Sequence, residues 1–425
     1  MAQGLLKFLL VPIGSAGDVH PFIWLGKLLR ARGHDVLCIA QAGVAEMPQR
    51  AGLPTLAWGD KDEQEQIIRN PDIWHPRKAL DVVTHYAGRW AKENLATIRG
   101  QVEPGRTVII NGALAFGARV LAEKTGIPLL TTHLQPSIFM SIDESPVMMA
   151  HLEWLPRAPR FVRRAFFALG NRMVDRKMAP AVDAIRHAEG LAGRTRGLMR
   201  HYWHSPDGVL CLFPEWFASK QRDWPPQAVT TRFPLYDEAG DRPEDPALEA
   251  FLHAGEAPVI VTPGSANAHA EAFIREAVAG AHAAGGRALV ITRYPEQAGT
   301  LPVGSACFAY VPFGQVFGRC AAVVHHGGIG TTAQCLAAGV PQLIMPMAHD
   351  QPDNANRIRR LGVGDYLYPK RFKARRIAAK LGTLIASPAV REACRRIRGQ
   401  IQAQMPEKDV GALIETLSAK ALDAA

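Results

Sequence analysis

The fold is indicated by two opening stretches, which read Leu5-Leu-Lys-Phe-Leu-Leu-Val-Pro-Ile13-Gly-Ser-Ala-Gly-Asp18 and Asp35-Val-Leu-Cys-Ile-Ala40. The apolar runs in both stretches are suited to strands that are buried on both faces. Between them, Pro21 can lie in the first turn of a helix, and Gly33 fits a left-handed cap at its end. A strand, a helix and a strand in this order predict a parallel sheet with right-handed crossovers.

Similar apolar runs recur in both halves of the chain. We expect strands at 107–110, 128–132, 209–213, 259–262, 288–292, 307–311, 321–325 and 342–345. Residues 233–258 are rich in proline and acidic side chains, which is typical of a linker. The sequence therefore predicts an α/β protein of two facing, doubly wound, Rossmann-like domains, 1–235 and 257–425, joined by a linker at 236–256. The helical C-terminal sequence is free to pack back on the first domain, and a ligand is expected in the crevice between the domains.

Composition narrows the class of protein. The 425 residues are 48% hydrophobic and 21% charged, which suits two globular cores. The net charge of +10 favours phosphate-bearing partners, but without a basic tail nucleic acid is a poor candidate. The first apolar run is too short for a signal peptide, and no stretch approaches the ~20 apolar residues of a membrane span. Six scattered cysteines suit a reducing compartment, so we expect a cytoplasmic protein.

A second informative stretch reads Val323-Val-His-His-Gly-Gly-Ile-Gly-Thr-Thr332. It is a buried strand that runs into glycines and hydroxyl residues at the start of a helix. Glycines let backbone N–H groups approach a diphosphate, and the helix N-terminus adds partial positive charge. A tight strand-to-helix turn that serves packing alone remains the alternative, since neither Gly-x-Gly-x-x-Gly nor a P-loop lysine is present.

The same stretch, with Ala338-Gly-Val-Pro341 and His349-Asp-Gln-Pro-Asp-Asn-Ala355, resembles the donor signature of inverting nucleotide-sugar glycosyltransferases. These enzymes have the two-domain GT-B architecture and act on macrolides, glycopeptides, sterols and plant metabolites. Gly14-Ser-Ala-Gly-Asp-Val-His-Pro21 and Arg32-Gly-His34 are similar to elements of the same family. A closer likeness is to the B-chain rhamnosyltransferases of rhamnolipid synthesis. It rests on His204-Ser-Pro-Asp-Gly-Val-Leu-Cys-Leu-Phe-Pro214, Asp223-Trp-Pro225, Phe233-Pro-Leu-Tyr-Asp237 and Ala348-His-Asp-Gln351.

The resemblance implies a donor site in the second domain. The residues that it assigns to the diphosphate are Gly264, Ser265, Gly328, Gly330, Thr331 and one of the two histidines His325 and His326. Asp350 and Gln351 would bind the hydroxyls of the donor sugar, although Asp350 by itself would also suit a helix N-cap. Val311, Pro312 and Phe313 lie where the family grips the nucleobase. Gln334 replaces a ribose-binding glutamate, which favours a dTDP donor.

Asp18 is the expected catalytic base, because an alcohol must lose its proton as it attacks the anomeric carbon. The resemblance places this base in the first strand–helix turn. A helix N-cap is the structural alternative for Asp18, and His20 is the second candidate for the base. We expect no metal and no cofactor other than the nucleotide sugar, since the histidine and the helix terminus would meet the leaving-group charge.

The acceptor side is indicated by two further stretches. Residues 136–140 and 147–149 are apolar and suit either an acceptor pocket or the core. Residues 157–178 are basic, with an apolar stripe at Phe161, Ala165, Phe166, Leu169 and Met173. This stripe would suit peripheral contact with an anionic membrane. We favour instead a helix that packs its stripe on its own domain and exposes a basic face.

These features predict inverting, metal-independent transfer of a sugar to a lipid hydroxyl, and the closer resemblance implies L-rhamnose from dTDP-rhamnose as the donor and an amphiphilic lipid as the acceptor. A hydroxyalkanoyloxy-alkanoate acceptor would give a mono-rhamnolipid, made in the cytoplasm or at the inner face of the membrane. One alternative is a sterol- or macrolide-type glycosyltransferase that uses a UDP- or dTDP-hexose, and another is a nucleotide-sugar epimerase. A non-catalytic nucleotide- or nucleic-acid-binding protein is the alternative of another class.

Overall fold

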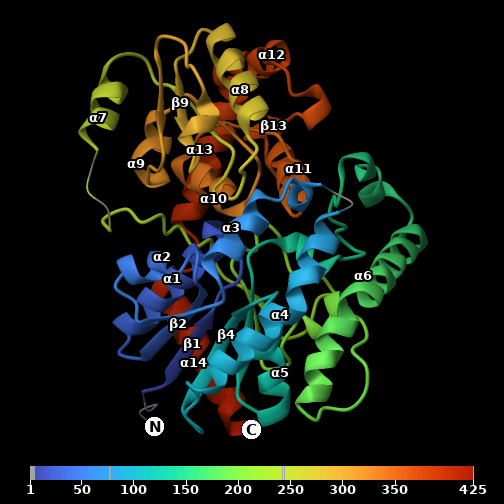
Figure 1. Cartoon of the computed structure of the whole chain (residues 1–425). Helices are drawn as coiled ribbons and strands as arrows, with labels where there is room; N and C mark the ends of the chain where they lie inside the picture. The colour runs from blue at the N-terminus through green and yellow to red at the C-terminus, as the bar shows by residue number, and fades with distance from the viewer. Residues whose placement is uncertain (1–4, 76–77, 242, 244, 425) are drawn as a thin grey trace.

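The computed structural model describes residues 5–75, 78–241, 243 and 245–424. Each half of the chain forms a sheet flanked by helices, and the two halves lie one above the other in Figure 1. Neighbouring strands of both sheets run parallel throughout. The predicted α/β class with two parallel-sheet domains is therefore confirmed.

The lower domain in Figure 1 is built on seven described strands. Their order is β3 (Thr55–Trp58), β2 (Asp35–Gln41), β1 (Lys7–Val11), β4 (Thr107–Gly112), β5 (Leu129–His133), β6 (Val209–Cys211) and β7 (Ala228–Thr230). The expected strands of this half overlap β1, β2, β4, β5 and β6. The edge strands β3 and β7 were not predicted, because short strands at a sheet edge lack a continuous apolar run.

Helices α1 (Ala16–Ala31), α2 (Glu46–Arg50), α3 (Lys61–Arg69), α4 (Ala79–Arg99), α5 (Phe116–Thr125) and α6 (Arg160–Ala188) belong to this domain. Short helical turns are η1 (Pro71–Trp74), η2 (Pro136–Phe139), η3 (Ala150–Leu152), η4 (Leu155–Arg157) and η5 (Leu198–Tyr202). The expectation that Pro21 lies in the first turn of α1 is wrong. The helix begins earlier because Ser15 and Asp18 cap it, so Pro21 lies inside.

Helix α6 also departs from the favoured interpretation of residues 157–178. Phe161, Leu169 and Met173 do not pack on the domain but are exposed to solvent. The residues that pack inward are Phe167, Val174 and Met178, on the opposite side of the helix. The sequence stripe was misassigned because α6 has apolar side chains on two faces, and periodicity alone does not tell which face meets the core.

The upper domain has six described strands, β10 (Ser305–Phe308), β9 (Ala288–Ile291), β8 (Val259–Thr262), β11 (Ala322–His325), β12 (Gln342–Ile344) and β13 (Gly364–Tyr366). Its helices are α7 (Pro246–His253), α8 (Glu271–Ala283), α9 (Phe313–Val316), α10 (Ile329–Ala338), α11 (Gln351–Leu361), α12 (Ala374–Ala386) and α13 (Pro388–Gln402). Three short turns are η6 (Pro295–Ala298), η7 (Phe317–Arg319) and η8 (Pro369–Arg371). The strand expected at 307–311 begins and ends earlier than predicted, at Ser305 and Phe308.

Alternating side chains of the upper sheet enter two cores. Val259 and Val261 of β8 pack with α8 and α12, whereas Ile260 packs on the other face with Leu248 of α7. Alternate side chains of a strand point to opposite faces, so a continuous apolar strand requires helices on both sides. The β8 run is apolar for this reason.

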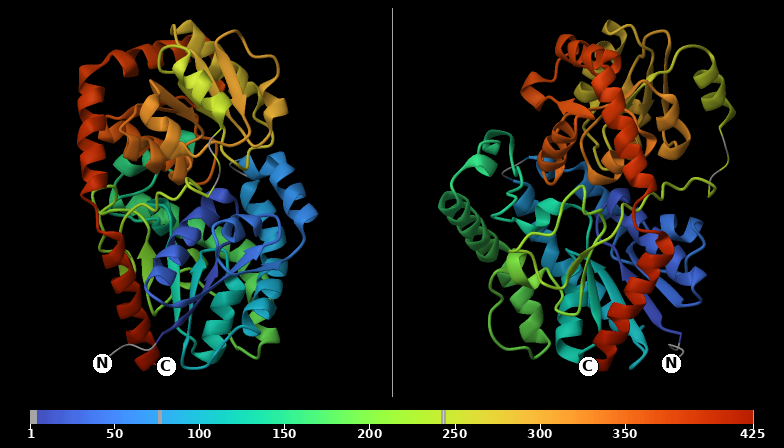
Figure 2. Two further views of the ribbon diagram at one scale, coloured as in Figure 1. Left: turned by 90° about the vertical axis from the view of Figure 1, so that its left-hand side faces the viewer. Right: turned by 180° about the vertical axis from the view of Figure 1, so that it is seen from behind.

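The last helix, α14 (Glu407–Ala424), leaves the upper domain and packs on the lower one (Figure 2). Val410 and Ile414 join the core of the lower domain. Glu415 accepts hydrogen bonds from Arg32 at 2.6 and 2.7 Å and lies 2.8 Å from His34 Nε2. The Arg-Gly-His element thus anchors the C-terminal helix. No helix of the described residues is long and apolar enough to cross a bilayer.

Candidate functional site

Asp18 lies in the first turn of α1 and lines a cavity between the two domains. Its Oδ2 atom accepts hydrogen bonds from the Ser15 amide at 2.8 Å and the Ser15 hydroxyl at 3.1 Å. Gly14 has a φ of 133°, and a Cβ there would lie 2.3 Å from Asp18 Oδ2. A glycine is therefore required beside this carboxylate. Burial raises the pKa of Asp18, and the bonds from Ser15 oppose the shift.

His20 lies away from this cavity. Its Nε2 atom is 3.1 Å from Glu238 Oε1, and its ring contacts the edge of Tyr236. Two residues along a helix turn the side chain by about 200°, so Asp18 and His20 face opposite ways. Of the two candidates for the base, only Asp18 lines the cavity.

The two histidines after β11 have different surroundings. His325 is fully buried, and both of its ring nitrogens are used within the protein, by the Gln342 side chain at 3.0 Å and by the Gly327 amide at 3.1 Å. The ring of His326 lies against two glycines, since a Cβ on Gly264 or Gly328 would approach it within 2.5 or 2.6 Å. Its Nδ1 atom is buried and finds no partner among the described residues. Burial lowers the pKa of His325 to about 3 and that of His326 to about 4, so both rings are neutral at pH 7.

The first turn of the helix that follows, α10, carries backbone N–H groups that can act as hydrogen-bond donors. Gly328 is the N-cap of α10, and the N–H of Ile329 donates to Asp350 Oδ2 at 3.2 Å. The N–H groups of Gly330 and Thr331 make no hydrogen bond within the part of the chain that the structure describes. Free N–H groups at a helix N-terminus form an anion site. Across the His326 ring, Gly264 adopts a φ of 90°, and Ser265 follows it.

Asp350 joins the same cavity from the second domain. Its Oδ2 atom also accepts from Asn354 at 2.6 Å. Burial raises the pKa of Asp350 to about 7, and the charge of Asp18 adds to the shift. Gln351 is buried, and its Oε1 atom accepts from the amides of Met347 and Ala348 at 2.8 and 3.3 Å. The carbonyl of the Gln351 side chain thus holds the turn that presents Asp350.

The region expected to hold the nucleobase packs on the protein itself. Val311 and Pro312 are buried, and Phe313 stacks on Phe317 with ring centres 4.4 Å apart. Gln334 donates to the Leu235 carbonyl at 2.8 Å, so the chain just before the linker contacts α10.

The cavity has a volume of about 360 Å³ and a mainly apolar wall. Met140, Met148 and Met149 belong to stretches that the sequence left open between pocket and core, and they line it. Phe139 and Val147 of the same stretches are buried in the protein. The pocket interpretation therefore holds for the three methionines, and the core interpretation holds for Phe139 and Val147.

Several wall residues were missed by sequence reasoning. They come from three separate elements: Leu80 and Val83 of α4, Met178 of α6, and Met199 with Trp203 at η5. No local pattern could reveal them, because they converge only through helix packing. Long flexible side chains such as methionine adapt to ligands of varied shape.

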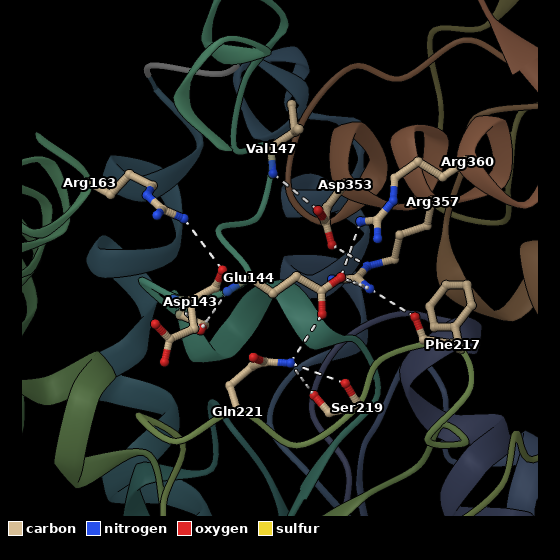
Figure 3. Close-up of polar contacts among 11 residues, drawn as sticks. Asp143, Glu144, Val147, Arg163, Phe217, Ser219, Gln221, Asp353, Arg357 and Arg360 are labelled. Carbon is tan, nitrogen blue, oxygen red and sulfur yellow. Dashed lines mark hydrogen bonds and ion pairs between the residues drawn. The ribbon is translucent and has the colours of Figure 1, made fainter. Parts of the chain in front are cut away.

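A buried ion-pair network joins the cavity wall to α11 (Figure 3). Arg357 donates to Glu144 at 3.0 Å, to Asp353 at 2.8 Å and to the Phe217 carbonyl at 2.8 Å. Asp353 in turn accepts from the Val147 amide at 3.1 Å. This network, which we call the Arg357 clasp, ties the Met148–Met149 segment to the helix that starts after Asp350. Among the described residues no His, Cys, Asp or Glu cluster could hold a metal ion.

Comparisons with known proteins bear on both halves of the chain. Residues 8–142 match the glycosyltransferase family 28 N-terminal domain, and residues 287–417 match the erythromycin biosynthesis protein CIII-like C-terminal domain. The chain is 31% identical to an O-mycaminosyltylonolide 6-deoxyallosyltransferase of Streptomyces fradiae, over 96% of this chain and 97% of that protein. It is 32% identical to a vancomycin aglycone glucosyltransferase of Amycolatopsis orientalis, over 84% and 85% of the two chains.

A solved structure shares the fold. The spinosyn rhamnosyltransferase SpnG, complexed with thymidine diphosphate, superposes with a TM-score of 0.64 at 19% identity. The match covers 97% of this chain and all of the other. At this identity the likeness concerns the two-domain architecture alone.

Proposed function

The chain belongs to the nucleotide-sugar glycosyltransferases of the macrolide and glycopeptide type, and from this premise we propose that it transfers L-rhamnose from dTDP-rhamnose to a lipid hydroxyl. The acceptor that we propose is an amphiphile such as a hydroxyalkanoyloxy-alkanoate, and the product is a mono-rhamnolipid. The observation that carries the proposal is the methionine-lined cavity with Asp18 and Asp350 in its wall. An apolar wall with two convergent carboxylates suits an acceptor that is mainly hydrocarbon and carries a hydroxyl.

In the proposed reaction Asp18 removes the acceptor proton. The acceptor oxygen bonds to the anomeric carbon while the bond from that carbon to the diphosphate oxygen breaks, so the configuration inverts. The raised pKa of Asp18 brings the base closer to the working pH. Only Oδ2 of Asp18 takes the bonds from Ser15, which leaves Oδ1 for the acceptor.

The departing charge would be met without a metal. Gly330 and Thr331 offer N–H groups at the start of α10, and Gly264 and Ser265 close the other side of the His326 ring. We assign the diphosphate contact to His326 rather than His325, since both nitrogens of His325 are already bonded. Fixed donors aimed at developing negative charge lower the barrier.

The same geometry supports assignments for residues that bind the donor's sugar and nucleotide. Asp350 would accept from a sugar hydroxyl, and the amide nitrogen of Gln351 remains for another. Gln334 offers no carboxylate to a ribose, and the related fold of SpnG binds thymidine diphosphate, which supports a dTDP donor. The proposal of rhamnose is supported by the sequence likeness to the rhamnosyltransferases of rhamnolipid synthesis and by the fold shared with SpnG, a rhamnosyltransferase.

A second candidate is glycosylation of a macrolide with a UDP- or dTDP-hexose. The identity to the tylonolide enzyme favours it, and methionines would also adapt to a rigid ring. The test is a matrix of dTDP-rhamnose and UDP-glucose against a hydroxyacyl lipid and a macrolide aglycone, read by mass spectrometry. Rhamnose on the lipid supports the proposal, whereas sugar on the macrolide alone transfers it to the second candidate. Nucleotide binding without product in any pair would leave a non-catalytic binding protein.

The cysteines bear on the cellular compartment of the protein. The six cysteines are free thiols, as a reducing compartment requires, so we propose the cytoplasm, with peripheral contact at the inner face of the membrane.

A further inference from the structure

The outer face of α6 exposes apolar side chains that no element of the described structure covers. We define this face by Phe161, Ala165, Leu169 and Met173, which repeat every four residues and so line one side of the helix. Phe161 is 74% exposed, Leu169 70% and Met173 51%. Trp154, just before the helix, is 52% exposed. Figure 1 shows α6 on the outside of the molecule, beside the lower domain.

The concentration of these side chains at one place is unusual for a monomer surface. Six large apolar residues of the described chain are exposed, and four of them lie on this segment. Single exposed apolar residues are ordinary, but a group of them marks an interaction surface. The opposite face of α6 is already used, since Phe167 and Val174 pack inward and Met178 lines the cavity.

The charge of residues 157–178 indicates which kind of partner the outer face of α6 can bind. Residues 157–178 carry seven lysines and arginines and a single acid, Asp175. Asp175 is engaged with the amides of Gly197 and Leu198. Arg172 and Arg176 are exposed on the same side as Leu169 and have no ion-pair partner among the described residues. Apolar side chains flanked by unpaired arginines complement a surface with an apolar interior and anionic headgroups.

We propose that the outer face of α6 rests on an anionic phospholipid bilayer. Phe161, Leu169 and Trp154 enter the boundary between headgroups and acyl chains, and Arg172 and Arg176 pair with lipid phosphates. The proposal deepens the proposed function and rests on it in one respect: a lipid acceptor would come from this surface. Because Met178 of the same helix lines the cavity, docking brings the membrane and the cavity to opposite sides of one helix.

The first test is flotation of the full chain with vesicles of phosphatidylcholine, with and without phosphatidylglycerol. We expect binding only to the anionic vesicles, and a fall with added salt. Phe161→Ser with Leu169→Ser should weaken binding roughly tenfold or more, through lost apolar burial. Arg172→Gln with Arg176→Gln should weaken it by a similar factor, about one order of magnitude. Val303→Ser is the matched control, since Val303 is 99% exposed in the other domain.

The second test reads the contact directly. Tryptophan emission should shift to shorter wavelength on anionic vesicles, and Trp154→Phe should remove the shift while vesicle binding persists. Equal binding by the wild type and the Phe161/Leu169 variant overturns the proposal. A dimer that the variant converts to a monomer, without vesicle binding, also overturns it, because the face would then join two copies of the chain. Sugar transfer to an acceptor in detergent micelles is measured separately. Vesicle binding with no lipid product would refute the proposed acceptor and leave the docking surface standing.

Discussion

The carboxylates of Asp18 and Asp350 belong to different domains and line one cavity, where the charge of Asp18 helps burial to raise the pKa of Asp350. Two carboxylates in one enclosed site do not ionise independently. Both carboxyl groups therefore hold a proton more readily than an ordinary aspartate does. This pairing exists only when the two domains are brought together.

Asp18→Asn should abolish sugar transfer and preserve donor binding. The amide keeps the shape and can still accept from Ser15, but it is no longer a base, so turnover should fall roughly 10²–10⁴-fold. Turnover with saturating donor and acceptor, beside a thermal shift with dTDP, checks this. Ser15→Ala is the control for the cap alone. Near-normal turnover in Asp18→Asn would reject the assignment of the base.

The stability of Asp350→Asn relative to the wild type should increase as the pH rises. The pKa of Asp350 is about 7 in the folded protein against 3.8 for an ordinary aspartate, so the folded state binds the extra proton between these values. The wild type therefore loses stability as pH rises from about 4 to 7, and the asparagine variant avoids this loss, by about 1 kcal/mol or more. The difference in Tm between variant and wild type should grow from pH 5 to pH 8. A constant difference would contradict the shift.

His326→Ala and His325→Ala should separate binding from folding. Loss of His326 should lower turnover roughly 10²–10³-fold and weaken the thermal shift with dTDP, with little change in the Tm of the free protein. Loss of His325 leaves the Gln342 side chain and the Gly327 amide unpaired and should lower that Tm. The reverse pattern would assign the diphosphate to His325.

Weakening the Arg357 clasp should impair binding of the acceptor rather than binding of the donor. Arg357→Met leaves the buried Asp353 without its cation and Glu144 with only the exposed Arg360, which should cost about 3–5 kcal/mol of stability. In the milder Glu144→Gln variant the Met148–Met149 segment loosens, so the acceptor KM should rise while the donor KM holds. Arg360→Gln is the control, because Arg360 is 60% exposed and its pair with Glu144 at 3.2 Å contributes under about 1 kcal/mol. A rise in the donor KM alone would contradict a role of the clasp in acceptor binding.

Some features could be predicted from the sequence because they are local. Continuous apolar runs indicated the strands, and the glycines beside Asp18 and His326 indicated turns with a close backbone approach. Edge strands such as β3 were missed, since a short strand has no clear periodicity. The start of α1 was misplaced because the capping residues Ser15 and Asp18, rather than Pro21, fix where the helix begins. The exposed face of α6 was misjudged because both faces of the helix carry apolar residues.

The sequence by itself determined the parallel α/β architecture, the loop after β11 and the carboxylate in the first turn. Each depends on residues close together in the chain, whose spacing expresses backbone geometry. Only the tertiary structure decided that Asp18 and Asp350 line one cavity while His20 does not. It also decided that His325 bonds to Gln342, and that methionines from separate segments form one wall. These relationships join residues far apart in sequence, and the packing of whole domains fixes their distances.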